Sequence, residues 1–555
     1  MKSLNQFLAF LQALNKKLNG ERNEAFINTE DPAIQIKPLQ SAHLQLNHLH
    51  LDSRQLEVAD VFIALQGARC HGLDYLTQAV AAKVACILSD RVLTQTEQAW
   101  LEQQANAPQI LVMTGLNRYL GALAHWYYDQ PSQKLNVVGI TGTNGKTSSA
   151  HYLVQLLLQL GQKPALMGTL GTGLVSSNAH LELETTFNTT PDVISVHRLL
   201  NQFYQQGANW VVMEVSSHAL ALGRIEQVVF EAVALTQVTR DHLDFHGTEQ
   251  AYHQAKARLF TDYKSRFQVI NVNDKLGQSL IKSDSLNHVF GYGLKPDNDA
   301  SLFYKCASLQ CASHQLNPTG IELDLVYKHQ TNQAWLNLMG KFNIENVLCA
   351  LSVVLACGFE WKKALGLLEN LTSVNGRMQK VANAPTVIVD FAHTADALAQ
   401  VLKALKQHVL SQLGQGSQNQ GSQDNQTNDA AYSGKIVVVF GCGGDRDQGK
   451  RPLMAKAAEA NAHQVVLTDD NPRFESTDKI MAEILKGFER PEMVVVIENR
   501  KQAIEAALNN AHKKDVVLIA GKGHEHYQDI QGMKHPFSDQ KVVQDWLKRH
   551  LQKNL

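Results

Sequence analysis

The sequence has few cysteines, no long apolar run and no excess of charge of either sign. Its 555 residues include seven cysteines, widely spaced and without a CxxC pair, which argues against a disulfide framework or a zinc finger and favours a reducing cytosol. No apolar stretch approaches the roughly 20 residues that a membrane span needs, so we expect no membrane insertion. Lys and Arg number 51 against 52 Asp and Glu. This balance lacks the basic surplus of a nucleic-acid-binding protein, so no nucleic-acid partner is expected.

The N-terminus carries apolar residues at helical spacing, among them Leu4, Phe7, Leu8 and Leu11. Gln and Asn interrupt this stretch, and no small-residue cleavage site follows it. The pattern therefore predicts an amphipathic helix and not a signal peptide.

The rest of the chain divides into three blocks in which short apolar runs alternate with helical stretches. These runs cover 61–65, 85–88 and 110–113 in the first block, 135–141, 210–215 and 232–238 in the second, and 386–389, 435–440, 464–467, 493–497 and 515–519 in the third. Continuous apolar strands that alternate with helices indicate parallel sheets covered on both faces. We therefore predict an α/β protein of three domains, with bounds 1–133, 134–375 and 376–555. Residues 414–429 contain no apolar side chain, which predicts a polar surface insertion.

The strongest local motif is Gly142-Thr143-Asn144-Gly145-Lys146-Thr147. It follows an expected strand and opens an expected helix over 146–160, which is the context of a phosphate-binding turn. Glycines let backbone N–H groups approach phosphate oxygens, the lysine pairs with phosphate, and the threonine hydroxyl suits Mg²⁺. Position 140 is Ile where the usual P-loop has Gly. An ordinary strand-to-helix turn is the alternative, and the flanking elements favour phosphate binding.

Two further strand ends in the second block carry polar residues. Glu214 ends the expected strand 210–215, where a carboxylate faces a P-loop and can hold Mg²⁺. The segment from Arg240 to His246 is rich in His and Asp; its HxxxH spacing permits zinc, but the oxygen-rich setting favours Mg²⁺. Lys256 follows in a helical stretch, and the local pattern alone predicts a solvated lysine.

Four motifs of the third block stand at the ends of expected strands: Asp390-Phe391-Ala392-His393-Thr394, the loop 441–447 (GCGGDRD), Asp470-Asn471-Pro472-Arg473, and 521–525 (GKGHE). Ligands of open parallel sheets bind outside the carboxyl ends of the strands. We therefore expect the four motifs to form one site. Arg446 and Arg473 offer guanidinium groups suited to carboxylate or phosphate.

Taken together, these motifs resemble those of the Mur ligases, ATP-dependent enzymes that add amino acids to the peptidoglycan precursor. The resemblance covers nearly the whole chain and also includes LDSR (51–54), NTTPD (188–192), MEVSSH (213–218), RDHLDFHG (240–247), GKFNIEN (340–346) and GRM (376–378). Motif by motif, it is greatest to the branch of the family that adds diaminopimelate as the third residue.

The resemblance implies a fold and a reaction. The fold is an N-terminal α/β domain for the UDP end of the substrate, a central P-loop ATPase domain with a parallel sheet, and a C-terminal Rossmann-like domain for the amino acid. The substrates are UDP-N-acetylmuramoyl-L-alanyl-D-glutamate and meso-2,6-diaminopimelate, and the cofactors are ATP and Mg²⁺. ATP converts the D-Glu carboxylate to an acyl phosphate, which the amine then attacks. A cytoplasmic monomer that serves cell-wall synthesis, cell shape and division is expected.

The resemblance also implies the site residues. Those for ATP are Gly142, Thr143, Asn144, Gly145, Lys146, Thr147, Ser148, Asn346, Arg377 and Asp390. Those for Mg²⁺ are Thr147, Glu214, His242 and Lys256, with Lys256 as a carbamylated lysine; Lys146, His242 and Lys256 are the catalytic set. Those for the UDP-dipeptide are Leu51, Ser53, Asn188, Thr189, Thr190, Ser216 and Arg224. Those for the amino acid are Arg446, Asp470, Asn471, Pro472, Arg473, Gly521 and Glu525, with Glu525 facing the distal ammonium.

The chain departs from the family pattern at three places. Ala68-Arg69-Cys70 stands where His-Gln-Ala is common, Leu222 where a Gln often contacts substrate, and Phe391 and Ala395 replace Tyr and Pro. Two alternatives to a diaminopimelate-adding ligase stay open: a lysine-adding or folylpolyglutamate-type ligase, and a P-loop protein that binds nucleotide without ligating. The Arg of DNPR favours diaminopimelate, because by the resemblance lysine-adding enzymes lack it.

Overall fold

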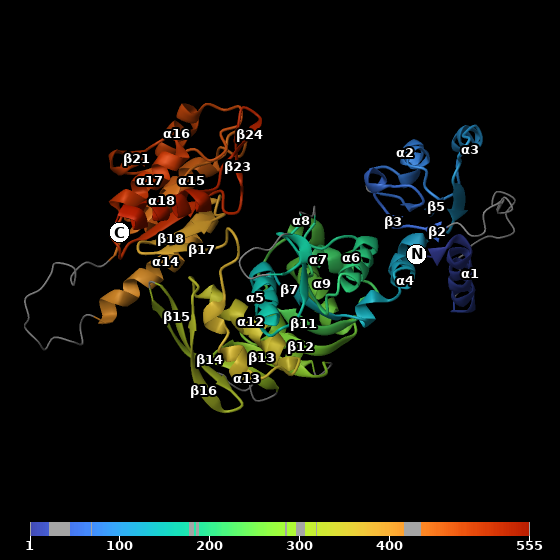
Figure 1. Cartoon of the computed structure of the whole chain (residues 1–555), viewed down its shortest axis with the longest axis horizontal. Helices are drawn as coiled ribbons and strands as arrows, with labels where there is room; N and C mark the ends of the chain where they lie inside the picture. Colours follow the sequence, from blue (N-terminus) through green and yellow to red (C-terminus); the bar gives the residue numbers. More distant parts are fainter. Residues whose placement is uncertain are drawn as a thin grey trace, which may run out of the picture.

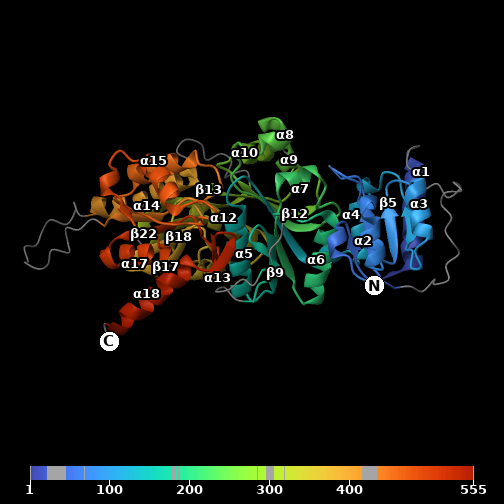
Figure 2. The ribbon, with the colours of Figure 1, turned by 90° about the horizontal axis from the view of Figure 1, so that it is seen from above.

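The computed structural model describes residues 2–21, 45–67, 69–176, 183–184, 188–283, 286–295, 306–317, 319–415 and 434–553. They form three α/β domains, and the central domain lies between the other two (Figures 1 and 2). The polar segment 414–429 lies outside the described residues from 416 onward, as does Ala68. No helix in the described ranges is both long and apolar enough to span a bilayer.

The N-terminal domain is built on a four-stranded parallel sheet of order β3-β4-β5-β6. Its elements are β1 (Lys2–Ser3), α1 (Leu4–Glu21), β2 (Gln45–Leu46), β3 (Leu49–His50), η1 (Ser53–Gln55), β4 (Val61–Ala64), η2 (Gly72–Tyr75), α2 (Leu76–Ala81), β5 (Cys86–Ser89), α3 (Gln95–Glu102), β6 (Gln109–Val112), η3 (Leu116–Arg118), α4 (Leu120–Tyr127) and η4 (Pro131–Gln133). The predicted N-terminal helix is α1; its Leu4, Phe7 and Leu11 are buried in the domain core.

The central domain contains a ten-stranded sheet of order β16-β15-β14-β13-β12-β11-β7-β10-β8-β9. Its strands are β7 (Asn136–Thr141), β8 (Pro164–Gly168), β9 (Gly171–Leu174), β10 (Trp210–Glu214), β11 (Phe230–Leu235), β12 (Ser265–Asn271), β13 (Val289–Leu294), β14 (Ala307–Asn317), β15 (Gly320–Tyr327) and β16 (Gln330–Leu336). Its helices are α5 (Lys146–Gln159), α6 (Val193–Gln205), α7 (Ser217–Ala221), α8 (Leu243–His246), α9 (Glu249–Thr261), α10 (Lys275–Lys282), α12 (Phe342–Ala356), α13 (Trp361–Leu365) and η5 (Leu368–Asn370). Two separate apolar cores cover the two faces of the sheet, one of which includes α5 and α12.

The C-terminal domain has a six-stranded sheet of order β17-β18-β22-β19-β20-β21. Its elements are β17 (Gln379–Asn383), β18 (Thr386–Asp390), α14 (Ala395–Gln415), β19 (Ile436–Phe440), α15 (Lys450–Asn461), β20 (Gln464–Leu467), α16 (Thr477–Leu485), η6 (Pro491–Met493), β21 (Val495–Val496), α17 (Arg500–Asn510), β22 (Val516–Ala520), the hairpin β23 (Tyr527–Ile530) and β24 (Met533–Pro536), and α18 (Asp539–Lys553). Helices α14, α15 and α16 pack on one face of the sheet, and α17 and α18 on the other.

The α/β prediction is confirmed, and the expected apolar runs match strands to within about three residues. The central sheet differs from a purely parallel one. Strand β9 pairs antiparallel with β8, and β14, β15 and β16 form an antiparallel extension. The burial of β14 to β16 is mixed along their length, so they lack the continuous apolar run that marks a strand covered on both faces.

Candidate active site

The predicted phosphate-binding turn joins β7 to α5 at the middle of the central sheet. Gly142 and Gly145 have φ values of 155° and 87°. A Cβ on Gly142 would lie 1.9 Å from Thr236 Oγ1, and one on Gly145 would lie 2.3 Å from Asn346 Oδ1. Only glycine fits these close approaches, so the turn is held tightly against the end of β11 and against α12. Lys146 is the first residue of α5, whose N-terminal N–H groups therefore face the turn.

Two lysines converge on this turn. Lys146 Nζ donates to the carbonyl oxygens of Gly142 and Thr143 over 2.8 and 2.9 Å, and Lys256 Nζ, from α9, donates to the same Gly142 oxygen over 2.8 Å. The predicted solvated position of Lys256 is wrong, since the residue is 1% exposed. Burial, followed by the charge of Lys146, lowers the pKa of Lys256 well below its usual value. Burial also lowers the pKa of Lys146.

Glu214 ends β10 with its carboxylate turned to the start of α5. The Thr147 hydroxyl donates to Glu214 Oε2 over 2.8 Å. Thr169, between β8 and β9, donates its backbone N–H to Oε1 over 2.8 Å and its hydroxyl to Oε2 over 3.1 Å. Glu214 is 1% exposed. The hydroxyl and carboxylate oxygens beside the turn are hard donors of the kind that Mg²⁺ prefers, so the residues present fit that ion.

His242 lies at the edge of this site, in a left-handed conformation with φ of 50°. Its Nε2 is 3.4 Å from Asp241 Oδ2, and its ring centroid is 4.8 Å from that of His218. Across the described ranges, no group of three or more His, Cys, Asp or Glu is arranged to hold a metal. The zinc alternative for His242 and His246 therefore gains no support.

Several residues predicted for the dipeptide lie beside Glu214. Thr190 Oγ1 donates to the Glu214 carbonyl oxygen over 2.9 Å and accepts the Ser216 N–H over 3.1 Å. Arg224 Nη1 donates to the Thr190 carbonyl oxygen over 3.0 Å, and the hydroxyls of Thr189 and Thr169 are 3.1 Å apart. Asn188 directly precedes Thr189. This segment therefore lies next to the phosphate-binding turn, through its contacts with Glu214.

The residues predicted for the UDP end lie in the N-terminal domain, immediately after β3. Leu51 is half-buried, and the hydroxyl of Ser53 donates to Gln78 Oε1 over 2.6 Å. Leu222, where the family pattern has Gln, is 56% exposed at the end of α7.

The remaining residues predicted for ATP lie on α12 and at the start of the C-terminal domain. Asn346 contacts the turn beside Gly145 and donates to Asn343 Oδ1 over 3.1 Å. Asp390, at the end of β18, accepts the N–H groups of Met378 and Ala392 over 2.7 and 2.8 Å, and burial raises its pKa. Arg377, just before β17 at the start of the C-terminal domain, is exposed.

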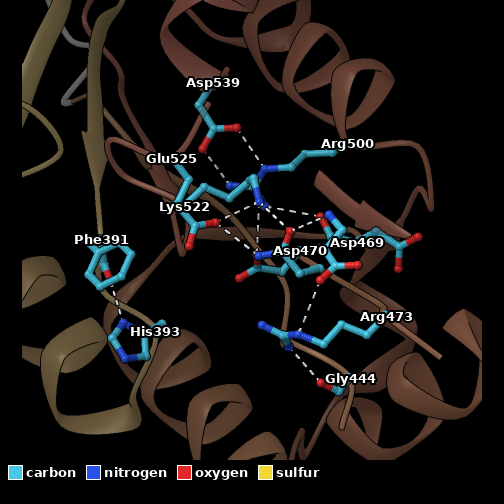
Figure 3. Close-up of polar contacts among 12 residues, drawn as sticks. Phe391, His393, Gly444, Asp469, Asp470, Arg473, Arg500, Lys522, Glu525 and Asp539 are labelled. Atoms are coloured by element: carbon cyan, nitrogen blue, oxygen red, sulfur yellow. Dashed lines mark hydrogen bonds and ion pairs between the residues drawn. The ribbon is translucent and has the colours of Figure 1, made fainter. Parts of the chain in front are cut away.

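The four motifs of the third block meet at the carboxyl ends of β18, β19, β20 and β22, as predicted. Figure 3 shows their polar contacts, with Lys522 pointing toward Asp470 and Glu525. Lys522 Nζ donates to Asn471 Oδ1 over 2.8 Å and to Glu525 Oε2 over 3.0 Å. Asn471 Nδ2 donates to the same Glu525 oxygen over 3.0 Å. The site therefore holds Asn471 and Glu525 in contact; Arg446 is exposed on the neighbouring loop.

Arg473 lies beside this cluster in a left-handed conformation with φ of 52°. Its Nη1 donates to the Gly444 carbonyl oxygen over 2.7 Å (Figure 3), and its Nε is 3.8 Å from Asp529 Oδ2. Asp529 belongs to β23, which the sequence analysis did not identify, and its backbone carbonyl accepts the Arg473 N–H over 3.0 Å. The Arg473 side chain as a whole is 23% exposed.

The sequence analysis missed three residues of these sites. Thr169 gave no signal, because a threonine between two strands is common. Asp529 lies on a short, half-exposed strand without an apolar run. Lys522 stood inside the GKGHE motif, but nothing in the pattern indicated that its ammonium is fully buried.

Comparison with known proteins now adds the decisive observation. A model of the Mur ligase middle domain matches residues 140–354, and one of the Mur ligase glutamate ligase domain matches 425–523. The UDP-N-acetylmuramoyl-L-alanyl-D-glutamate–2,6-diaminopimelate ligases of Xylella fastidiosa and Pseudomonas aeruginosa are each 39% identical to this chain; each match covers 91% of it, and 94% and 96% of the relative. The chain belongs to the Mur ligase family. The resemblance drawn from the motifs is thereby confirmed.

Solved structures of Mur ligases share the fold. The structure of a UDP-N-acetylmuramoyl-L-alanyl-D-glutamate–2,6-diaminopimelate ligase matches with a TM-score of 0.66 at 31% identity, covering 92% of this chain and 97% of that one. The ligase of Acinetobacter baumannii that is named for adding D-alanyl-D-alanine matches with a TM-score of 0.56 at 15% identity, covering 91% and 93%. The second likeness concerns the three-domain Mur ligase fold alone.

Proposed function

We propose that this Mur ligase joins meso-2,6-diaminopimelate to UDP-N-acetylmuramoyl-L-alanyl-D-glutamate with ATP, in peptidoglycan precursor synthesis. The observation that carries the proposal is that the same strand edge holds Arg473, whose Nη1 donates to the Gly444 carbonyl, and the hydrogen-bonded pair Asn471 and Glu525. A cation and a carboxylate side by side suit the distal carboxylate and ammonium of diaminopimelate. Relatives of 37–39% identity that bear this enzyme name support the same assignment.

The phosphates of ATP bind at the turn 142–148, where Lys146 and the N-terminus of α5 supply positive potential. ATP supplies the phosphoryl group that turns the D-Glu carboxylate into an acyl donor. Asn346 beside Gly145, and Arg377 and Asp390 from the C-terminal domain, complete the nucleotide site. Lys146 stabilises the negative charge of the phosphoryl group during its transfer, and burial strengthens that interaction.

Thr147 and Glu214 would hold Mg²⁺, with His242 and a carbamylated Lys256 as further ligands. The ion would neutralise phosphate charge in the reaction. Carbamylation forms an N–C bond between a neutral amine and CO₂ and releases one proton to solvent, and the lowered pKa of Lys256 favours the neutral amine. The product is an anion, which removes the repulsion between two ammonium groups that share the Gly142 carbonyl.

The three domains divide the binding between them, at bounds near 133 and 375. Leu51 and Ser53 bind the UDP end, while Asn188, Thr189, Thr190, Ser216 and Arg224 orient the dipeptide toward the turn. The amino acid is held by the C-terminal motifs. Bringing polyanionic substrates together in this way converts a bimolecular reaction into an effectively unimolecular one. The cytoplasm, where ATP and UDP-linked precursors occur, is the expected compartment.

Phosphate release from purified protein tests the proposal. Release should require ATP, the UDP-dipeptide and diaminopimelate together, and omission of any one should abolish it. ATP hydrolysis independent of the other two would instead favour the P-loop protein that ligates nothing. Equal or better use of lysine would favour the lysine-adding alternative.

A further inference from the structure

Lys522 has a buried ammonium group that cannot contact a bound ligand directly. Its side chain is fully buried, with exposure of 0%. Its Nζ donates to Asn471 Oδ1 over 2.8 Å and to Glu525 Oε2 over 3.0 Å, and it lies 3.5 Å from Asp470 Oδ1 in an ion pair (Figure 3). The ring of Tyr527 covers the ammonium, with the centroid 5.7 Å from Nζ. A lysine with its donors committed in this way acts on a substrate only through its partners.

These contacts fix the orientation of Asn471. Its Oδ1 accepts from Lys522 Nζ and from the Asp529 N–H, each over 2.8 Å. Because an ammonium and a backbone N–H can only donate, the amide oxygen must face them and Nδ2 must face Glu525. Asn471 Nδ2 accordingly donates to Glu525 Oε2 over 3.0 Å.

The same contacts fix the orientation of Glu525. Within the described part of the chain, the hydrogen bonds to its carboxylate from Lys522 and Asn471 both end on Oε2. Oε1 takes part in neither of these bonds, and the Glu525 side chain is 21% exposed. Lys522 also offsets part of the negative charge of Asp470 and Glu525.

Lys522 indirectly holds the segment that carries Arg473. Asn471 binds the Asp529 N–H, the Asp529 carbonyl accepts the Arg473 N–H over 3.0 Å, and the Arg473 carbonyl accepts the Gln531 N–H over 2.8 Å. The left-handed conformation of Arg473 depends on this pairing with β23, because that conformation is strained for a residue with a side chain.

We propose that Lys522 is a positioning residue of the amino-acid site, which sets the orientation of Asn471 and Glu525 toward the distal end of the incoming amino acid. This inference rests on the proposed function. If the wild-type enzyme does not use diaminopimelate, the proposed function is wrong. The variants below test the role of Lys522 in an enzyme that does use diaminopimelate.

The test compares Lys522→Met, which keeps the length of the side chain and removes its charge, with wild type. The Michaelis constant for diaminopimelate should rise about 30-fold, as expected when one partner of a buried charged hydrogen bond is lost. The constants for ATP and the UDP-dipeptide should stay within about 3-fold, because their sites do not contact Lys522. A uniform change in all three constants, or none for diaminopimelate, would overturn the proposal.

Trp546→Ala is the control for lost stability. Trp546 on α18 is 7% exposed in the core of the same domain, and its Nε1 donates to Asn509 Oδ1 over 2.8 Å at the C-terminal end of α17, whereas Lys522 follows the carboxyl end of β22. Its replacement should lower Tm while the Michaelis constant for diaminopimelate stays within about 3-fold of wild type. If Trp546→Ala raises that constant as much as Lys522→Met does, the effect is one of domain stability and the proposal fails.

A double-mutant cycle tests whether Lys522 acts through Glu525. If it does, Lys522→Met combined with Glu525→Gln should lose little more affinity for diaminopimelate than the weaker-binding single variant. Fully additive losses would mean that the two residues act independently, which contradicts the proposal. Should Lys522→Met not fold, Lys522→Gln, which keeps two N–H donors and removes the charge, enters the same cycle with the same two possible outcomes.

Discussion

Lys146 and Lys256 donate to one acceptor, the carbonyl oxygen of Gly142, each over 2.8 Å. Two ammonium groups so close repel each other, and burial strengthens the repulsion. The charges of Glu214 and Asp241 partly oppose the lowering of the Lys146 pKa. The pKa of Lys256 is lowered well below its usual value. Lys146 is therefore the better-placed cation for phosphate, and Lys256 the better-placed amine for carbamylation.

Lys256→Ala should be nearly inactive, because it removes the group that carbamylation turns into an anion. Acetate, a short carboxylate that fits the vacated space, should restore part of the activity. Incubation of wild type with ¹³C-labelled CO₂ should give a carbamate carbon signal that Lys256→Ala lacks. Full activity of Lys256→Ala, together with no labelled carbamate in wild type, would contradict a role for carbamylated Lys256.

Lys146→Ala should abolish ligation and leave the fold intact, since it removes a cation that contacts phosphate in the ground state and the transition state. Lys275→Ala is the control: Lys275 is also the first residue of a helix after a sheet strand, but it is exposed. Circular dichroism and phosphate release together decide the case. A folded Lys146→Ala with near-normal turnover would contradict the assignment of the phosphate-binding turn.

Acidification should destabilise the protein through two buried histidines. Burial lowers the pKa of His151 and His197 to about 4 from the usual 6.5. Between these values the unfolded chain binds more protons than the folded one, so stability is fully present above pH 6.5 and falls as the pH drops toward 4. Each histidine should lower the free energy of unfolding by about 2 kcal/mol at pH 5 relative to pH 8. Burial raises the pKa of Asp469 to about 6, which acts in the opposite sense.

His151→Leu isolates one of these contributions in urea unfolding at pH 8 and pH 5. The difference in unfolding free energy between the two pH values should shrink by about 2 kcal/mol. His535→Gln, on the exposed strand β24, should leave that difference as in wild type. An unchanged pH dependence in His151→Leu would show that this histidine does not titrate as its burial implies.

Local sequence was enough to predict the turn between β7 and α5, because a continuous apolar strand, two glycines and a helix are adjacent in the chain. It was not enough for β23 and β24. Their two-residue turn, Gln531 and Gly532 with φ of 50° and 77°, has the conformation of a tight hairpin but not its usual Asn-Gly or Asp-Gly pair. Asp529 was missed with this hairpin.

Buried charge was the other feature that the sequence did not reveal. Lys256 and Lys522 occupy helical and loop patterns in which lysine is ordinarily solvated, and their burial follows from elements distant in sequence. The same holds for Thr169, which contacts Glu214 only because β8 lies beside β10 in the sheet. The family resemblance supplied the role of Lys256, whereas local chemistry alone did not.

The central claim is that this ligase selects diaminopimelate through Arg473. Without the distal carboxylate of the substrate, a desolvated guanidinium loses its ligand, which penalises lysine. Asp529, whose Oδ2 is 3.8 Å from Arg473 Nε, is a rival carboxylate for the guanidinium.

The most direct test is the ratio of kcat/KM for diaminopimelate to that for lysine, in wild type and in Arg473→Ala. Wild type should prefer diaminopimelate. Arg473→Ala should lose about 30-fold or more for diaminopimelate, equivalent to at least about 2 kcal/mol, and far less for lysine, so the ratio should collapse. A wild type that prefers lysine, or a ratio that Arg473→Ala leaves unchanged, would contradict the account.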